Sequence, residues 1–382
     1  MVNRTTLRQS VLVSAGTVFN SLLGLLFYIL VAKNLGVEKF GHFSYLLGLG
    51  LLAAELGDLG INSAIVKFGS GDKFSAIFSF AIVQRAIIFV PIIIIFLYLG
   101  LFPSAAVAIG LLLAYLTTQG LLARQKFSLQ VFANISGNLL RLLLIIATPL
   151  SAITVFFLGT IGTFIIGMLT LFKEFKGFDL NKKFAKEILR FSLPAAGSFS
   201  LSSIASKIDV PILYSLAGPV AVGLYSSAQK LASVIPQIAS ALDGVFAPKF
   251  SQKSPTALRQ YLILAGLISL GILIFIPFSG TLITFVFGNK YLGSETVFQI
   301  LLLSFIPFFL SGPFLGKILY GLGKTKHLLL VSTVNLIISI TGLIILIGIF
   351  QANGAALTFV ITNTVALVFY VLISFIFRHQ AN

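Results

Sequence analysis

Long apolar runs, each ended by a short polar or basic turn, recur along the whole chain. An α-helix needs about 20 apolar residues to cross a bilayer, and about twelve runs reach that length. We therefore predict an all-α polytopic membrane protein with about 12 transmembrane helices. The predicted spans are residues 11–32, 42–66, 75–99, 104–123, 128–149, 151–172, 192–216, 221–246, 257–284, 297–321, 328–349 and 354–377.

One helical hairpin occurs twice in the sequence. Residues 8–68 align without a gap with residues 190–250, so that the turn at 36–44 is aligned with the turn at 218–226. The two turns share glycines at their first and sixth positions, where backbone geometry restricts the choice of residue. The repeat predicts two pseudo-symmetric six-helix lobes. An even number of spans per lobe gives both the same orientation, as in transporters with parallel repeats.

The predicted lobes are separated by the longest stretch between spans. We place the N-lobe at residues 1–175, the linker at 176–190 and the C-lobe at 191–382. Within the linker, Phe184 and Ile188 are four positions apart and lysines occupy the other faces. This pattern predicts a short helix that lies on the cytoplasmic lipid surface.

Composition agrees with the membrane assignment. Hydrophobic residues make up 58% of the chain and charged residues 9%, with a mean hydropathy of +1.07. A typical soluble protein has about 25% charged residues. The chain has no cysteine, which excludes disulfides.

Lysine and arginine predict the orientation. With the N-terminus in the cytoplasm, most of the 26 basic residues fall in cytoplasmic segments. The opposite side holds only Lys33, Lys39 and Lys290. This asymmetry follows the positive-inside rule and places both termini in the cytoplasm, in a multi-pass protein of the cytoplasmic (inner, plasma) membrane. It also explains most of the +16 net charge, and no nucleic-acid-reading motif accompanies the basic residues.

Several charged residues fall inside predicted spans. A cation at a helix centre costs about 2.5–3.5 kcal/mol, so these side chains must face one another, a wet cavity or the headgroups. They either form buried salt bridges, for example Asp58 or Glu55 with Arg85, or line a functional cavity, which we favour for the set. Pro211 and Pro236 lie within spans and predict kinks or hinges. The charged residues that matter most here are Arg85, Arg141, Lys207, Lys230, Glu55, Asp58 and Asp209.

Motifs for several other functions are missing from the sequence. It has no P-loop, no dinucleotide-binding glycine motif and no clustered metal-ligand set. The predicted outer loops are too short to hold a catalytic domain. We therefore expect a secondary transporter and not an enzyme.

Several segments resemble the polysaccharide (O-antigen type) flippases of the multidrug/oligosaccharidyl-lipid/polysaccharide (MOP) exporter superfamily. They are Leu7-Arg8-Gln9-Ser10, the run from Ala32 to Gly41, Gly57-Asp58-Leu59-Gly60-Ile61, Arg190-Phe191-Ser192-Leu193-Pro194 and Gly223-Leu224-Tyr225-Ser226. The resemblance implies alternating access around a central cavity. It implies an undecaprenyl-diphosphate-linked oligosaccharide as substrate, carried to the outer leaflet for cell-surface polysaccharide biosynthesis.

The resemblance also implies roles for the intramembrane charges. Arg85, Arg141, Lys207 and Lys230 would bind the diphosphate, because cations compensate its desolvation. Glu55, Asp58 and Asp209 would couple transport to Na⁺ or H⁺, or balance the cations. No other cofactor is implied, and the implied partners are membrane lipids and the polysaccharide polymerase machinery.

Other functions stay open. An ion-coupled drug or cation exporter of the same superfamily would be expected to carry an acidic residue in the first span, which has none. Lipid II flippase relatives have two further helices. A non-transporting membrane scaffold would not need charges at mid-membrane, and a membrane glycosyl enzyme would need an outer catalytic loop.

Overall fold

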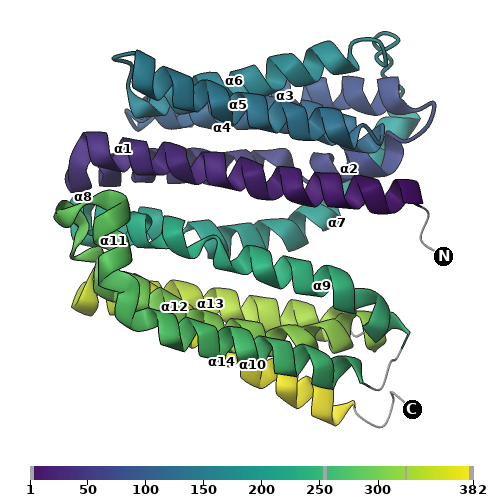
Figure 1. Cartoon of the computed structure of the whole chain (residues 1–382). Coiled ribbons are helices and arrows are strands. Elements are labelled where there is room, and N and C mark those ends of the chain that lie inside the picture. Colours follow the sequence, from purple (N-terminus) through teal and green to yellow (C-terminus); the bar gives the residue numbers. More distant parts are fainter. Residues whose placement is uncertain (1–3, 253–255, 323–324, 378–382) are drawn as a thin grey trace. The chain divides into compact units, whose positions relative to one another are not determined.

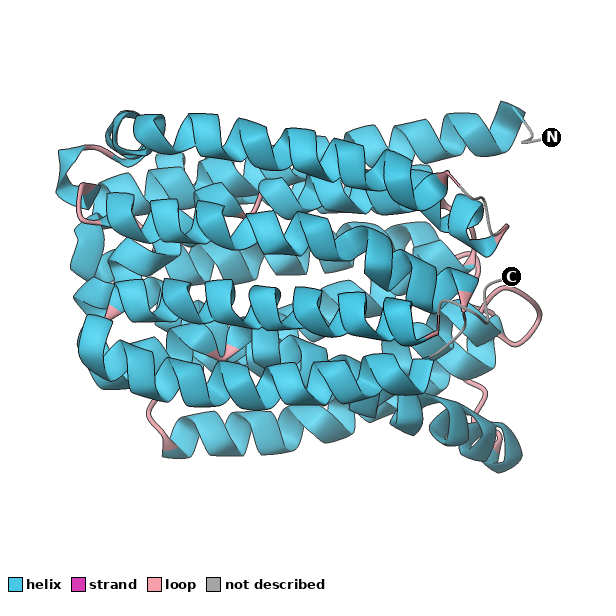
Figure 2. Cartoon of the chain, turned by 90° about the horizontal axis from the view of Figure 1, so that it is seen from below, coloured by secondary structure: helices cyan, strands magenta, loops and turns pink. Residues whose placement is uncertain are grey.

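The computed structural model describes residues 4–252, 256–322 and 325–377, and within these ranges the regular structure is entirely helical. Short loops join the helices (Figure 1, Figure 2). The elements, in chain order, are α1 Arg4–Asp58, α2 Ile61–Phe68, α3 Phe74–Tyr98, α4 Phe102–Ala123, α5 Phe127–Ala147, α6 Ala152–Leu171, α7 Lys182–Lys207, α8 Asp209–Ala232, α9 Ile235–Ser251, α10 Ala257–Phe275, η1 Ile276–Phe278, α11 Ser279–Phe287, η2 Asn289–Tyr291, α12 Ser294–Gly316, η3 Lys317–Gly321, α13 Thr325–Phe350 and α14 Ala352–Ile376.

The predicted all-α polytopic membrane fold is confirmed, whereas the count of twelve is not. By length and hydropathy, ten helical segments of the described chain are able to cross a membrane. One of them, Ala15–Asp58, has 44 residues, which at 1.5 Å per residue is about 66 Å of helix. That is about twice the 30 Å hydrocarbon core. The helical path is broken within this segment at Gly36, between the predicted spans 11–32 and 42–66.

The two turns of the repeated hairpin have the same backbone geometry. Gly36 has φ 73° and ψ 174°, and Gly218, its aligned partner, has φ 78° and ψ −178°. A positive φ with an extended ψ is a conformation that essentially only glycine adopts. The alignment of the two turns, derived from the sequence, is therefore confirmed by the fold.

The division into compact units differs from the predicted lobe boundary. Unit 1 comprises Met1–Val31 and Tyr45–Lys207, and unit 2 comprises Ala32–Ser44 and Ile208–Asn382. The segment Ala32–Ser44, which contains the first turn of the repeat, belongs to unit 2 because its residues form hydrogen bonds with residues of that unit. The Tyr291 hydroxyl donates to the carbonyl oxygen of Ala32 at 2.8 Å, and His42 Nδ1 lies 2.9 Å from the Tyr214 hydroxyl. The predicted lobes and the linker at 176–190 stay a prediction.

The predicted short helix on the lipid surface is not a separate element. Residues from Lys182 onward form the first turns of α7, which continues without a break to Lys207. Phe184 and Ile188 are buried in a protein core with residues of α2 and α3, such as Ile61 and Phe78. An apolar pair at this spacing is compatible with lipid or with protein, and here protein covers it.

The two prolines predicted to kink spans lie at helix starts. Pro211 is in the first turn of α8, just after the break at Ile208, and Pro236 is in the first turn of α9, just after the break at Ser233–Val234. Proline is tolerated in a first turn because its missing N–H has no helical partner there. The predicted spans 192–216 and 221–246 are therefore each interrupted just before the proline. A hinge motion at these breaks stays a prediction.

The two turns meet within unit 2 through backbone atoms. A Cβ added at Gly41 would collide with the carbonyl oxygen of Pro219, and one added at Gly223 would collide with that of Val37. Gly41 aligns with Gly223 in the repeat, and Val37 aligns with Pro219. Each copy therefore presents a glycine to the same carbonyl of the other copy.

We predict that Gly41→Ala destabilises the protein by about 1–3 kcal/mol, the usual cost of overpacking a close contact. The measurement is thermal unfolding of the purified protein, followed by size-exclusion chromatography after heating. Gly266→Ala is the matched control, since a Cβ there meets nothing within 4 Å. Equal melting temperatures for the two variants would show that the close approach of the turns is not required.

Candidate functional site

Arg85 on α3 lies in a buried ion pair in unit 1. Its Nη2 donates to Oδ1 of Asp58 at 2.6 Å and to Oδ1 of Asn62 at 3.0 Å. Its Nη1 donates to Oε1 of Gln84 at 3.0 Å, and the side chain is 1% exposed. Asp58 is the last residue of α1, and Asn62 lies in the first turn of α2. The guanidinium thus holds together three helices, and the salt bridge named as an alternative from the sequence is present.

We predict that Asp58→Ala lowers stability by about 3–5 kcal/mol, because it leaves the Arg85 guanidinium buried without its counter-charge. The measurement is the melting temperature together with the amount of folded protein in the membrane. A double variant, Asp58→Ala with Arg85→Met, removes both charges and should recover most of the loss. Additive losses in the double variant would contradict the coupling.

A second ion pair engages Lys207 and Glu55. Lys207 Nζ is 2.5 Å from Glu55 Oε1, and the two side chains are 27% and 29% exposed. Lys207 is the last residue of α7, and Glu55 lies on α1 one turn before Asp58. Two of the four predicted diphosphate ligands, Arg85 and Lys207, therefore have acidic partners within unit 1.

Arg141 has a different environment from the other unit 1 cations. It makes no ion pair with any residue that the structure describes. Its Nη1 donates to Oδ1 of Asn138 at 2.7 Å, and Asn138 in turn donates from Nδ2 to Oδ1 of Asn20 at 2.8 Å. The guanidinium carbon lies 3.9 Å from the ring centre of Phe156, a cation–π distance. Arg141 Nε is buried without a hydrogen-bond partner.

Glycine at position 159 makes room for this arginine. Gly159 lies on α6, three residues after Phe156, and a Cβ there would collide with Cγ and Nε of Arg141. The aliphatic part of the Arg141 side chain therefore crosses the surface of α6. Packing of this kind lowers the side-chain freedom of arginine and fixes the guanidinium at one place.

Arg141 lines a polar cavity of about 270 Å³ within unit 1. Arg141 is the one formally charged residue in its lining; the other lining residues carry mainly amides and hydroxyls. They come from α1, α4, α5 and α6, and the polar ones are Asn20, Tyr115, Thr118, Gln119, Gln130, Asn134, Asn138, Thr160 and Thr163. Such a lining offers donors and acceptors together, which suits a ligand with hydroxyl and phosphate groups.

The polar face of α5 was not recognised from the sequence, although the signal was present. Gln130, Asn134, Asn138 and Arg141 are spaced by four, four and three residues, and all four line the cavity. This spacing places them on one face of a helix. The sequence prediction considered Arg141 without its neighbours on the helix and therefore missed this polar stripe, which ends at Arg141.

Tyr115 lies in the cavity within electrostatic range of residues of both ion pairs. This α4 residue lines the cavity and interacts electrostatically with Glu55, Asp58, Arg141 and Arg85.

The remaining predicted charges belong to unit 2. Asp209, 1% exposed, accepts from the Tyr225 hydroxyl at 2.6 Å and from Gln229 Nε2 at 2.8 Å, both at Oδ2. Its Oδ1 accepts from the Val210 N–H at 2.8 Å. Lys230 interacts with the carboxylate electrostatically. These three hydrogen-bond donors to Asp209 are neutral, whereas Asp58 and Glu55 each accept from a cationic side chain.

No cluster of three or more metal-ligating side chains occurs in the parts of the chain that the structure describes.

The first two thirds of the chain match a known protein family. Residues 6–254 match the profile of the polysaccharide biosynthesis protein family. The chain belongs to this family. It is 28% identical over 194 residues to the capsular polysaccharide biosynthesis protein CapF of Staphylococcus aureus, a match that covers 48% of this chain and 49% of CapF. The match thus spans about half the length of that relative. The family expected from the sequence is confirmed.

Solved structures of MOP superfamily transporters share the fold. An inward-facing multidrug-resistance transporter of the MATE family matches with TM-score 0.71 and 17% identity, covering 95% of both chains. The lipid II flippase MurJ in an inward-closed conformation matches with TM-score 0.72 and 19% identity, covering 95% of this chain and 87% of MurJ. A MOP transporter from Pyrococcus furiosus matches with TM-score 0.61 and 18% identity, over 97% and 94% of the two chains. At these identities the likeness concerns the fold alone.

Proposed function

We propose that this member of the family is a flippase that moves an undecaprenyl-diphosphate-linked oligosaccharide from the cytoplasmic to the outer leaflet by alternating access. The family and the MOP fold support flippase-type transport, and the distribution of basic residues supports a cytoplasmic location of both termini. The substrate class rests on the chemistry of the Arg141 cavity. A polysaccharide polymerase as partner stays a prediction.

The observation that carries the proposal is that Arg141, an intramembrane arginine in a polar cavity, forms no ion pair with any residue that the structure describes. A cation at mid-membrane costs about 2.5–3.5 kcal/mol on insertion scales, so its retention calls for a compensating role. A guanidinium forms strong, geometrically defined hydrogen bonds with phosphate oxygens. The surrounding amides and hydroxyls match sugar hydroxyls. At about 270 Å³ the cavity holds the diphosphate or one sugar and not a whole oligosaccharide.

Of the four cations predicted to bind the diphosphate, Arg141 is a better candidate than Arg85 and Lys207, because those two are already paired with acids. A diphosphate at Arg85 would have to displace Asp58 from a buried pair, and at Lys207 it would compete with Glu55. We therefore assign charge balance to these two pairs. The role of Lys230, which interacts electrostatically with Asp209 in unit 2, as a phosphate ligand stays a prediction.

We predict that Arg141→Ala abolishes surface glycan in a host whose own polysaccharide flippase is deleted and in which the wild-type chain restores it. Arg141→Lys should restore part of the glycan, because lysine keeps the charge and loses the two-pronged hydrogen bonding. Surface glycan would be quantified at matched membrane levels of each variant. Arg259→Ala, at an exposed position on α10, is the control and should behave as the wild type.

Full restoration by Arg141→Ala would show that the cavity does not bind the diphosphate. If the wild type is well expressed and restores no glycan, sugar mismatch is tested with a second host. Failure there too would favour the alternative function, export of drugs or cations by an ion-coupled member of the same superfamily.

We further propose that Asp209 is the residue that couples transport to Na⁺ or H⁺. Asp58 and Glu55 are engaged in direct ion pairs, whereas the donors to Asp209 are a hydroxyl, an amide and a backbone N–H. Such a carboxylate exchanges a proton or a cation at lower cost than one already paired with a guanidinium.

The prediction for Asp209→Asn is loss of the ion-gradient dependence of transport. In proteoliposomes containing a fluorescent short-chain lipid-linked oligosaccharide, a Na⁺ or H⁺ gradient should accelerate wild-type translocation several-fold and leave the variant unchanged. Asp243→Asn is the control, since that carboxylate accepts from the Tyr261 hydroxyl at another place in unit 2. A gradient response in Asp209→Asn equal to that of the wild type would exclude this role.

A further inference from the structure

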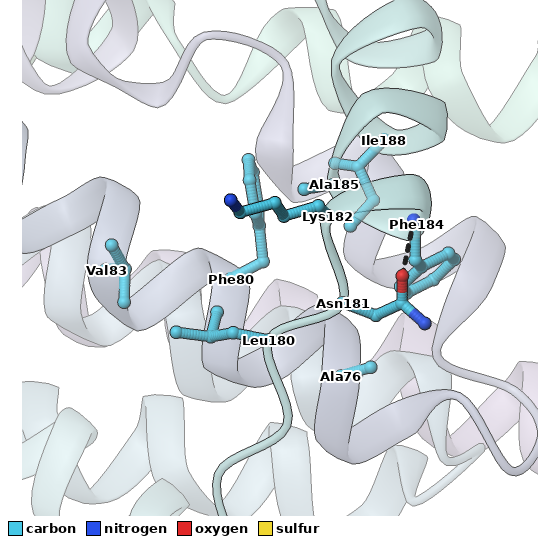
Figure 3. A pocket seen from close by; sticks show the side chains of 9 residues that line it. All are labelled: Ala76, Phe80, Val83, Leu180, Asn181, Lys182, Phe184, Ala185 and Ile188. Atoms are coloured by element: carbon cyan, nitrogen blue, oxygen red, sulfur yellow. Dashed lines mark hydrogen bonds between the residues drawn. The ribbon is translucent and has the colours of Figure 1, made fainter.

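A narrow apolar groove lies within unit 1 between α3 and the beginning of α7. Ala76, Phe80 and Val83 of α3 form one wall, and Leu180 and Phe184 belong to the other (Figure 3). Its volume is about 190 Å³. The side chain of Lys182 extends over the groove beside Phe80 (Figure 3). The groove thus combines an apolar floor with an ammonium group at its edge.

The α3 wall of the groove continues as an exposed apolar stripe. After Val83, positions on the same helix face are Ile87, Val90 and Ile94, which are 64%, 57% and 60% exposed. Steps of three and four residues keep all of them on one face. An apolar chain seated in the groove would therefore continue along α3 into the hydrocarbon core without meeting a polar side chain on this stripe.

Hydrogen bonds fix the other wall onto α3. Ser75 Oγ accepts from the Lys176 N–H at 3.0 Å, and Ser79 Oγ accepts from the Asp179 N–H at 3.1 Å. At the start of the same loop, Glu174 pairs with Lys126 and Arg124, both at 2.7 Å. Hydrogen bonds from Lys126 and Arg124 hold the pKa of the Glu174 carboxyl below its usual range. The groove is consequently a preformed feature of unit 1.

The charge around the groove favours an anion. Lys182, Lys183 and Lys186 are exposed and make no ion pair with the part of the chain that the structure describes. The nearby Glu187 is paired with Lys73 at 3.8 Å. Asn181 caps α7, accepting from the Lys183 N–H at 2.9 Å, so the positive end of the α7 dipole also lies here.

We propose that this groove binds one anionic phospholipid of the cytoplasmic leaflet, with its phosphate at Lys182 and one acyl chain in the groove and along Ile87, Val90 and Ile94. An anionic headgroup complements the unpaired lysines, and the acyl chain complements the stripe. The groove shares no lining residue with the Arg141 cavity, and Asn181, its other polar residue, is used in capping. A sugar-bearing lipid therefore finds no sugar ligands here, which is why we assign a phospholipid and not the prenyl tail of the transported substrate.

The absence of tryptophan from the sequence permits a direct test. Leu180→Trp places a single indole at the groove, where the native side chain is 55% exposed. The purified variant is reconstituted in phosphatidylcholine bilayers that contain the same mole fraction of either brominated phosphatidylglycerol or brominated phosphatidylcholine. Bromine quenches indole fluorescence on contact. We expect at least twofold stronger quenching by the anionic lipid.

Two control sets separate a site from general attraction. Leu267→Trp, at a position on α10 that is 60% exposed, should be quenched equally by both lipids. In the Leu180→Trp background, Lys182→Gln should abolish the preference, whereas Lys183→Gln removes the same charge outside the groove lining and should keep most of it. If Leu180→Trp does not fold, Ile87→Trp on the α3 stripe replaces it.

Three results would overturn the proposal. The first is equal quenching by both lipids at position 180. The second is an equal effect of Lys182→Gln and Lys183→Gln, which would indicate diffuse surface charge. The third is relief of quenching by unbrominated undecaprenyl diphosphate at about one molecule per protein, where phosphatidylglycerol at the same amount has no effect, because the occupant would then be the prenyl lipid.

Discussion

A charge or hydrogen-bonding group placed inside a bilayer has no water to satisfy it, and this constraint organises the interior of unit 1. Asp58 and Arg85 satisfy each other, and Glu55 and Lys207 do the same. Once these pairs are formed, Arg141 is left with amides, an aromatic ring and a polar cavity. The site therefore emerges by elimination. Among the predicted unit 1 cations, Arg141 is the one that forms no ion pair with a described residue, and we propose that it is available to a ligand.

Apolar run lengths were sufficient to predict the polytopic helical fold, and the turn glycines to predict the repeated hairpin, because both depend on local properties. Membrane thickness limits the length of a span, and only glycine accepts the backbone angles at Gly36 and Gly218. The number of crossings depends on how breaks such as those at Ile208 and Ser233–Val234 divide long helical stretches. Hydropathy averaged over a window does not resolve such breaks.

The site was predicted less completely because it depends on which helices become neighbours. The sequence contained the partners Asp58 and Arg85 without showing that they would meet. The stripe from Gln130 to Arg141 was accessible from helical periodicity, but Tyr115 and Thr160 join it only through packing of α4 and α6 against α5. Phe184 and Ile188 illustrate the converse error, since their spacing shows an apolar face and not what covers it.

The Asp58–Arg85 pair also has a consequence for the order of events during synthesis. Its two residues are 27 positions apart, so Asp58 is made first. At about 5–20 residues per second, a few seconds pass before Arg85 leaves the ribosome. During that interval the carboxylate at the end of α1 has no counter-charge. Burying this carboxylate in lipid costs less once α3 supplies Arg85, so the pair favours entry of α3 together with the first hairpin.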